Sequence, residues 1–204
     1  MTAIPEVPDR PSGSGAPYWY WLGGRPALDY VNTRRERWRR GVECLLDAAD
    51  VVAWLQRAGL LPDGAPAPSA AVVGQARELR EAIDAAVRAA VAGTPADPVA
   101  VGIIDEWLAF AGGRPALVVG PGGTPVLSER AEADSPRRAL GMVAFDAAQM
   151  LGRPEERGRI RICASETCSA RFYDRSPAGR RRWCSMARCG NVEKARRHRA
   201  RAAT

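Results

Sequence analysis

The C-terminal fifth of the chain contains two short cysteine pairs, in the sequences CASETC at residues 163–168 and CSMARC at residues 184–189. Four residues separate the cysteines of each pair, and fifteen residues separate the two pairs. This arrangement is typical of a tetrahedral Zn²⁺ site, because each pair forms a tight turn and the loop between them closes around the ion. We therefore predict one structural zinc site with four thiolate ligands, Cys163, Cys168, Cys184 and Cys189.

Disulfide bonds and unrelated buried thiols are the alternatives to a zinc site. Disulfides are typical of secreted proteins, but residues 1–16 lack the basic and apolar regions of a signal peptide. Buried structural thiols have apolar neighbours, whereas Arg, Ser, Glu and Asp surround these four cysteines. Four thiolates also fill the coordination sphere of the ion, so a catalytic zinc with an open position is not expected.

The length of 204 residues suits one medium-sized domain, or one such domain with a small appendage. No apolar run approaches the roughly 20 residues that are needed to span a bilayer. Because a signal peptide and a membrane segment are both missing, we expect a cytoplasmic protein without a membrane partner. The only histidine is His198, and the usual catalytic groupings of side chains are missing, so we do not expect an enzyme.

Charge is unevenly distributed along the chain, whose formal net charge is +7. From Arg157 to the C-terminus there are 14 basic and three acidic residues, so the tail is strongly basic and the remainder is mildly acidic. Four thiolates around one Zn²⁺ ion would lower the charge of the tail by only about two units. The asymmetry favours a polyanionic partner, with nucleic acid as the first candidate.

The N-terminal region divides into three segments. Residues 1–17 are rich in Pro, Gly and Ser, and we expect them to be disordered. The aromatic residues 18–21 are either a stacking platform for a ligand or, as we favour, a segment pinned onto the core. The stretch 25–40 is expected to open as a helix at a proline, and its arginine-rich second half to be solvated. On that helix Asp29 and Asn32 share a face, where they either bind a ligand or hydrogen-bond a neighbouring loop.

Hydrophobic periodicity predicts four helices in the middle of the chain, at residues 47–59, 69–93, 97–112 and 135–152. Residues 116–119 and 124–127 flank a Gly-Pro-Gly-Gly turn, which indicates a β-hairpin with Pro125 on an edge strand. Residues 154–158 are expected to form a linker. The predicted fold class is α+β, a predominantly helical body with one β-hairpin and a small C-terminal zinc finger. We place the domains at residues 1–17 (disordered), 18–153 (helical body) and 154–204 (basic zinc finger).

The predicted zinc finger is a treble-clef-like unit. Residues 160–162 and 171–173 alternate like two strands around the first cysteine pair, and residues 190–203 indicate a helix. The apolar stripe of this helix is narrow, comprising only Val192, Ala195 and Ala202, so cationic side chains cover most of its circumference. At roughly 50 residues the unit has too little core to fold unaided, and zinc binding would supply much of its folding free energy.

The tail resembles the CGNR zinc-finger family. The residues that carry this resemblance are the four cysteines, Phe172-Tyr173-Asp174, Arg182-Trp183-Cys184 and Cys189-Gly190-Asn191. The sequence LDYVNT at residues 28–33, followed by the helix at residues 47–60, is similar to the ABATE domain. That domain precedes the finger in bacterial proteins described as stress-induced transcription regulators. One position departs from the pattern, because the signature Arg after Cys-Gly-Asn is Val192 here, and Arg188 or Lys194 could take over its contacts.

The resemblance implies a bacterial regulator of the stress response that binds DNA through its zinc finger. Its body would then sense a small-molecule effector or form a homodimer. We expect phosphate contacts from the arginines before Trp183, and groove contacts from cations spaced three and four apart along the last helix. The candidate DNA-binding residues are Arg180, Arg181, Arg182, Arg188, Lys194, Arg197 and Arg201. The alternative is a zinc-stabilised module that binds an acidic protein partner or RNA.

Overall fold

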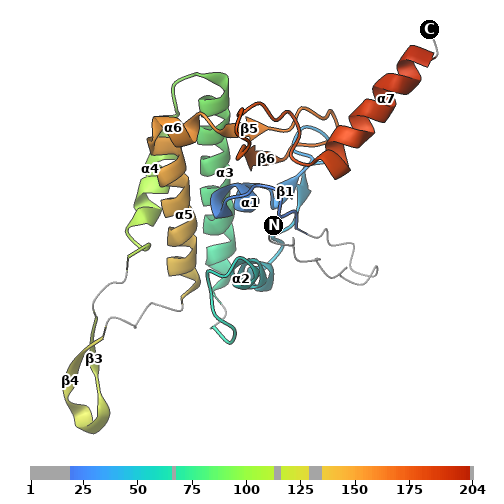
Figure 1. The fold of residues 1–204 in the computed structure, drawn as a ribbon. Coiled ribbons are helices and arrows are strands. Elements are labelled where there is room, and N and C mark those ends of the chain that lie inside the picture. The colour runs from blue at the N-terminus through green and yellow to red at the C-terminus, as the bar shows by residue number, and fades with distance from the viewer. Residues whose placement is uncertain (1–18, 66–67, 113–115, 129–134, 203–204) are drawn as a thin grey trace. The chain divides into compact units, whose positions relative to one another are not determined.

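The computed structural model describes residues 19–65, 68–112, 116–128 and 135–202. The disorder expected for residues 1–17 falls outside this part of the chain. The fold has two compact units. We call the first the finger unit; it combines the residues up to Cys44 with Val87–Pro95 and the chain from Leu151 onward. The second, the body unit, contains Leu45–Ala86 and Ala96–Met150. Helices dominate, and the described strands form small two-stranded antiparallel sheets, which confirms the predicted fold class (Figure 1).

Four helices account for most of the body unit, and the predicted helix positions are confirmed. They are α2 (Ala48–Arg57), α3 (Ala70–Ala92), α4 (Pro98–Leu108) and α5 (Pro136–Gly152), of which α3 and α5 continue into the finger unit. The side chain of Asp47 caps α2 by accepting a hydrogen bond from the Asp50 N–H, and Asp97 caps α4 through the Val99 N–H. Gly59, with φ of 70°, follows α2 in the left-handed conformation that commonly ends a helix.

The apolar faces of these helices form the core of the body unit. Its fully buried side chains include Trp54 of α2, Leu79 and Ile83 of α3, and Leu140 of α5. A Cβ atom at Gly141 would lie 2.7 Å from the Ala111 nitrogen, so a glycine there lets α5 approach the residues that follow α4. None of the described helices is long and apolar enough to cross a membrane.

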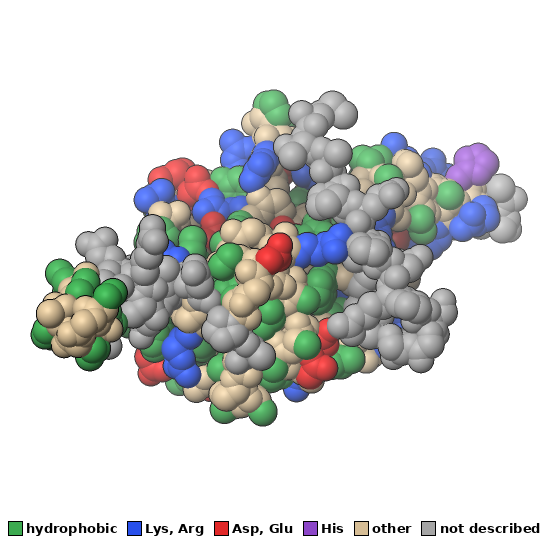
Figure 2. Space-filling model, turned by 90° about the horizontal axis from the view of Figure 1, so that it is seen from below, with side chains coloured by type: hydrophobic (Ala, Val, Ile, Leu, Met, Phe, Trp, Pro, Cys, Tyr) green, Lys and Arg blue, Asp and Glu red, His purple; other side chains and the backbone are tan. Residues whose placement is uncertain are grey.

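The body unit also carries the predicted β-hairpin. Strand β3 (Ala116–Val119) pairs with β4 (Pro125–Ser128) around the 3₁₀ turn η1 (Pro121–Gly123). Leu117 faces Leu127 across the pair, and their side chains are 73% and 69% exposed. No residue from 116 to 128 is charged. In Figure 2 the hairpin is accordingly covered by hydrophobic side chains without blue or red between them.

The N-terminal part of the finger unit differs from the expected solvated run. Helix α1 (Pro26–Val31) begins at the predicted proline, but it is followed by the antiparallel strands β1 (Arg34–Arg35) and β2 (Val42–Glu43). The connecting turn contains Glu36, whose φ is 47°, and its carboxylate binds the Arg40 guanidinium at 2.5 Å. The sequence gives no signal for this hairpin, because its strands contain only two residues each and carry no alternating apolar pattern.

The C-terminal part of the finger unit follows the prediction more closely. The expected linker contains one helical turn, α6 (Pro154–Arg157), which begins at its proline. Strands β5 (Ile160–Ile162) and β6 (Arg171–Tyr173) form an antiparallel pair in which Arg161 faces Phe172. A π-helical turn, η2 (Met186–Gly190), leads directly into the last helix, α7 (Asn191–Ala202).

Candidate metal centre

The first cysteine pair lies in the turn between β5 and β6. The Cys163 N–H donates to the Ala170 carbonyl at 2.9 Å, which continues the strand pairing by one step. The Cys168 N–H donates to the Ser165 carbonyl at 3.1 Å and closes the turn. The Ala170 N–H points at the Cys168 Sγ, 3.4 Å away. Such an N–H group stabilises negative charge on the sulfur, as a thiolate ligand requires.

The second cysteine pair spans most of η2, because Cys184 lies two residues before this turn and Cys189 lies within it. Ser185, directly after Cys184, caps this turn by accepting a hydrogen bond on its side chain from the Arg188 N–H. The Cys189 N–H donates to the Ser185 carbonyl at 3.0 Å. The two halves of the site are joined directly, because the Ala164 N–H donates to the Arg182 carbonyl at 2.8 Å.

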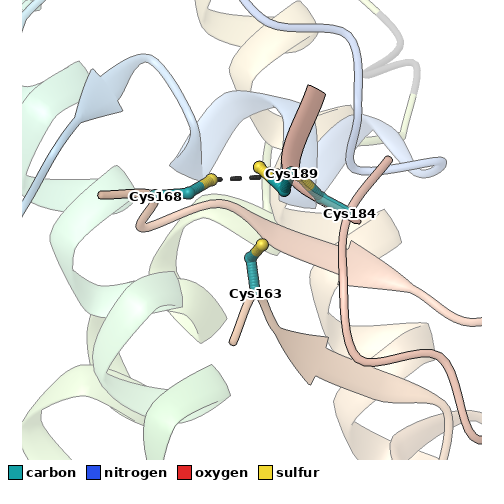
Figure 3. Close-up of side chains that lie close together, drawn as sticks. All are labelled: Cys163, Cys168, Cys184 and Cys189. Carbon is teal, nitrogen blue, oxygen red and sulfur yellow. Dashed lines mark hydrogen bonds between the residues drawn. The ribbon is translucent and has the colours of Figure 1, made fainter. Parts of the chain in front are cut away.

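The four sulfur atoms turn toward a common point (Figure 3). All of them lie within 4.8 Å of one another. The sulfur of Cys184 is 3.8 Å from that of Cys168 and 3.7 Å from that of Cys189. Zn–S bonds of about 2.3 Å in a tetrahedron place neighbouring sulfurs about 3.8 Å apart. The donor set therefore fits a single Zn²⁺ ion in both chemistry and spacing.

Because the four sulfur atoms are close together, the pKa values of the four thiols shift in different directions. Hydrogen bonds from Cys168 and Cys184 lower the pKa of Cys163, whereas hydrogen bonds with Cys163 raise the pKa of both Cys168 and Cys184. Burial raises the pKa of Cys189, and the neighbouring thiolates raise it further. Because thiolates at this distance repel one another, all four ionise together only when a cation offsets their charge.

The apolar core around the cysteines is small. Its buried members are Phe172, Ala170 and three of the cysteines, and Leu22, Cys168 and Trp183 pack against them. A cluster of this size buries too little apolar surface to offset the conformational entropy of the loops around it. This agrees with the expectation that a metal ion contributes much of the stability of the finger.

Asp174 fixes the loop that leads to the second cysteine pair. Burial disfavours the charged form of its carboxylate, but hydrogen bonds from the backbone N–H groups of Arg181 and Ser176, at 2.8 Å and 3.0 Å, keep its pKa below the ordinary value. The side chain therefore remains ionised at neutral pH. The Arg181 guanidinium in turn donates to the Cys184 carbonyl at 2.7 Å. The loop is thus tied to the backbone beside a predicted ligand.

Helix α7 is attached to the first cysteine turn through Glu193. One carboxylate oxygen of this buried side chain accepts a hydrogen bond from Ser165 Oγ at 2.9 Å, and the other accepts one from Arg196 Nε at 3.1 Å. Arg196 also donates to Glu166 at 2.8 Å, and these two carboxylates raise its pKa. The expected apolar stripe does not hold the helix, because Val192 is 53% exposed. Ala195 is exposed as well, and the side chain of Ala202 lies outside the described part.

The candidate DNA-binding residues are in several environments. Lys194 and Arg201 are exposed on α7, and their spacing of seven residues places them on one face of the helix. In Figure 2 several blue Lys and Arg side chains lie near the purple histidine side chain, with hydrophobic side chains between them. Arg180 and Arg182 are exposed, and the Arg182 guanidinium lies 5.3 Å from the centre of a Trp183 ring.

Among the remaining candidates, Arg181 and Arg188 are exposed but contact neighbouring groups, and one side chain is not described. The Arg188 guanidinium lies 3.8 Å from the centre of the Tyr20 ring. Arg181 is engaged by the Cys184 carbonyl. The side chain of Arg197 lies outside the described part of the chain. A role of these residues in binding DNA stays a prediction.

The suggested ligand residues both bond to backbone atoms. Asp29 accepts a hydrogen bond from the Gly23 N–H at 2.7 Å. Asn32 pairs with β6, because its amide donates to the Arg171 carbonyl at 2.9 Å and accepts from the Arg171 N–H at 2.8 Å. Asn32 also lines a cavity of about 420 Å³, whereas Asp29 is not among the residues that line it. A ligand role for this pair stays a prediction, and attachment to neighbouring backbone is what the contacts show.

One contribution to the site was expected from the sequence and another was not. In the described part of the aromatic segment, Trp19 is bonded to the rest of the chain as we favoured, since its Nε1 donates to the Cys44 carbonyl at 3.1 Å. The strand pair β1 and β2 also reaches the cysteine turn: the Arg37 N–H donates to Ser169 Oγ at 3.0 Å, and Trp38 Nε1 donates to the Glu166 carbonyl at 3.3 Å. The tryptophan within the arginine run was the only sequence signal for this contact.

Comparison with known families agrees with this geometry. A family model named ABATE, described as a putative stress-induced transcription regulator, matches residues 24–154, which is more than half of the chain. A second model, the CGNR zinc finger, matches residues 159–202 and includes all four clustered cysteines. Among curated proteins, none is significantly similar to the chain. The protein therefore belongs to the ABATE family, described as putative stress-induced transcription regulators, and carries a CGNR zinc finger after its ABATE domain.

Proposed function

We propose that this protein is a cytoplasmic regulator that binds DNA through α7, presented on a finger that holds one structural Zn²⁺ ion. The observation that carries the proposal is the attachment of α7. Glu193 and Arg196 hold its first turns against the cysteine turn, while Lys194 and Arg201 remain exposed. An exposed row of cations on a fixed helix is suited to a polyanionic duplex.

The residues divide into a metal-binding set and a DNA-binding set. Cys163, Cys168, Cys184 and Cys189 would hold the ion, which supplies folding free energy and no chemistry of its own. The exposed Arg180 and Arg182 of the loop would contact phosphates, and α7 would enter or border a groove. Because phosphate contacts carry no sequence information, these arginines set affinity and register rather than specificity.

For the helical body we propose dimerisation through the β3–β4 hairpin. Its strands expose paired leucines, and no charge interrupts the apolar surface from residue 116 to residue 128. The same uncharged surface on a second copy would cover it in a symmetric contact. A symmetric dimer also suits a DNA reader, because two copies can bind two half-sites.

Fluorescence anisotropy with a labelled DNA duplex tests the DNA-binding proposal directly. The zinc-loaded full-length protein should bind with an affinity that falls steeply with salt, by about 0.9 log units per phosphate contact for each log unit of salt. Lys194→Gln and Arg201→Gln should each weaken binding and reduce that slope by about 0.9, since each removes one cation from α7.

Arg153→Gln is the matched control, because Arg153 is an exposed arginine of the same unit that lies outside the finger match. Its affinity and its salt slope should equal those of the wild type. An affinity that stays flat between low and physiological salt would refute the proposal. Equal losses in Arg153→Gln and Lys194→Gln would also count against a specific role for α7.

A further inference from the structure

A cavity of about 420 Å³ lies within the finger unit. Its walls come from β1 and the turn that follows it, the aromatic N-terminal segment, the first cysteine turn and η2. This volume is in the range of cavities that bind small molecules. The charged residues that line it are Arg34, Arg35, Glu36, Arg39, Arg40 and Arg188.

The lining carries a large excess of positive charge. Among its described residues Glu36 is the only acidic one, and Arg40 already binds both of its carboxylate oxygens, at 2.5 Å and 2.8 Å. Arginines thus outnumber carboxylates in the lining by five to one. Cys168 and Cys189 also line the cavity, and a tetrathiolate zinc centre there would contribute about two negative charges, fewer than the positive charges of the lining arginines.

Two of these arginines are gathered on one aromatic ring. The guanidinium carbons of Arg35 and Arg188 lie 3.9 Å and 3.8 Å from the centre of the Tyr20 ring. The two cations can therefore be no further apart than the sum of these distances, about 7.7 Å. Like charges this close repel each other, and the ring offsets only part of that repulsion. An anion with several oxygens could contact both guanidinium groups at once.

The cavity also connects elements that position α7. Arg188 lies in η2, which contains Cys189 and runs directly into α7. Arg39 comes from the turn between β1 and β2, and this strand pair is bonded to the cysteine turn through the Arg37 N–H and Ser169 Oγ. A ligand that contacts both arginines would therefore link η2 to the strand pair.

We propose that this cavity binds a phosphate-bearing anion through Arg35, Arg39 and Arg188. Guanidinium groups bind phosphate oxygens in pairs, which suits a site built from arginines rather than lysines. The bound anion stabilises the finger by relieving the repulsion among these cations. Because the inference concerns the finger unit alone, it stands whether or not the protein binds DNA.

Isothermal titration calorimetry of the zinc-loaded full-length protein with inorganic pyrophosphate, at constant ionic strength, tests this site. We expect saturable one-to-one binding that Arg39→Gln weakens about tenfold and Arg39→Lys weakens less. Arg153→Gln, which removes an exposed arginine outside the cavity, should leave the affinity unchanged. Zinc content and circular dichroism establish that each variant is folded. Absence of saturable binding, or an equal loss in Arg153→Gln, overturns the proposal.

A second set of titrations distinguishes a free phosphorylated molecule from a DNA phosphate as the source of the anion. If the cavity receives DNA, pyrophosphate will compete with a labelled duplex, and Arg39→Gln will weaken both ligands. If the cavity receives a small molecule, the Arg39→Gln variant will bind pyrophosphate more weakly. Its affinity for DNA will stay within about twofold of the wild type, since Arg39 is outside the proposed DNA-binding set. Both results support the anion site. A wild type that binds pyrophosphate but no duplex would refute only the proposed function.

Discussion

Glu193 is the buried carboxylate of an otherwise cationic helix. It lies in the first turn of α7, where a negative charge interacts favourably with the helix dipole. One of its carboxylate oxygens accepts a hydrogen bond from Ser165 in the cysteine turn, and the other accepts one from Arg196 in the next turn of α7. The orientation of α7 therefore depends more on this charge than on apolar contacts.

Replacing Glu193 with Gln should loosen α7 without removing the metal. The amide can still accept from Ser165, but its NH₂ group cannot replace the charged acceptor of Arg196. We expect a loss of about 1 to 2 kcal/mol in local stability, which corresponds to about 5- to 30-fold faster hydrogen exchange of the α7 amides. Mass spectrometry after hydrogen exchange measures this effect.

Glu166→Gln is the matched control for Glu193→Gln. Glu166 also binds Arg196, but its side chain is 70% exposed, so solvent screens the pair and its removal should cost at most about 1 kcal/mol. Both variants should retain the zinc content of the wild type. Unchanged exchange of α7 in Glu193→Gln would show that other contacts hold the helix.

At the scale of elements, the sequence predicted the helices and strands that have a clear hydrophobic pattern, a capping residue or a turn motif. The starts of α2 and α4 followed from Asp47 and Asp97, the β3–β4 hairpin from its glycine-rich turn, and the cysteine turn from the spacing of its cysteines. The β1–β2 pair could not be predicted in this way. It depends on distant contacts, such as Arg37 with Ser169, that no local pattern encodes. The role of Glu193 was hidden for the same reason.

The β3–β4 hairpin yields a prediction at the same scale. Leu127→Glu should weaken self-association, because it places a charge opposite Leu117 in the surface that a second copy would cover. Sedimentation equilibrium should show a wild-type dimer and a dimer dissociation constant at least about tenfold higher for the variant. Val101→Glu adds the same charge at an exposed apolar position of α4, outside the hairpin, and should have little effect. A wild type that stays monomeric at all concentrations tested would contradict the dimer proposal.

At the scale of the whole molecule, family boundaries and structural units differ. The ABATE match begins at residue 24, yet the described residues up to Cys44 belong to the same compact unit as the zinc finger. Two backbone contacts account for this: the Tyr173 N–H donates to the Gly23 carbonyl at 2.8 Å, and Asn32 pairs with Arg171. A Cβ atom at residue 23 would lie 2.6 Å from the Asp29 nitrogen, so glycine is needed where the segment passes. The finger therefore takes part of its structure from the opposite end of the chain.

Removal of the metal should destabilise the finger unit and leave the body unit folded. Chelation of zinc from the full-length protein, or the Cys184→Ser change, should abolish amide protection in residues 160–202, since the small apolar cluster cannot hold the finger alone. Protection in α1 should fall with it, because α1 is bonded to β6 through Asn32. Helices α2 and α4 should stay protected, as their core contains none of the clustered cysteines. Cys44→Ser, which changes a buried cysteine outside the cluster, should leave zinc content and finger protection intact. Continued protection of α1 after chelation would show that this segment belongs energetically to the body unit.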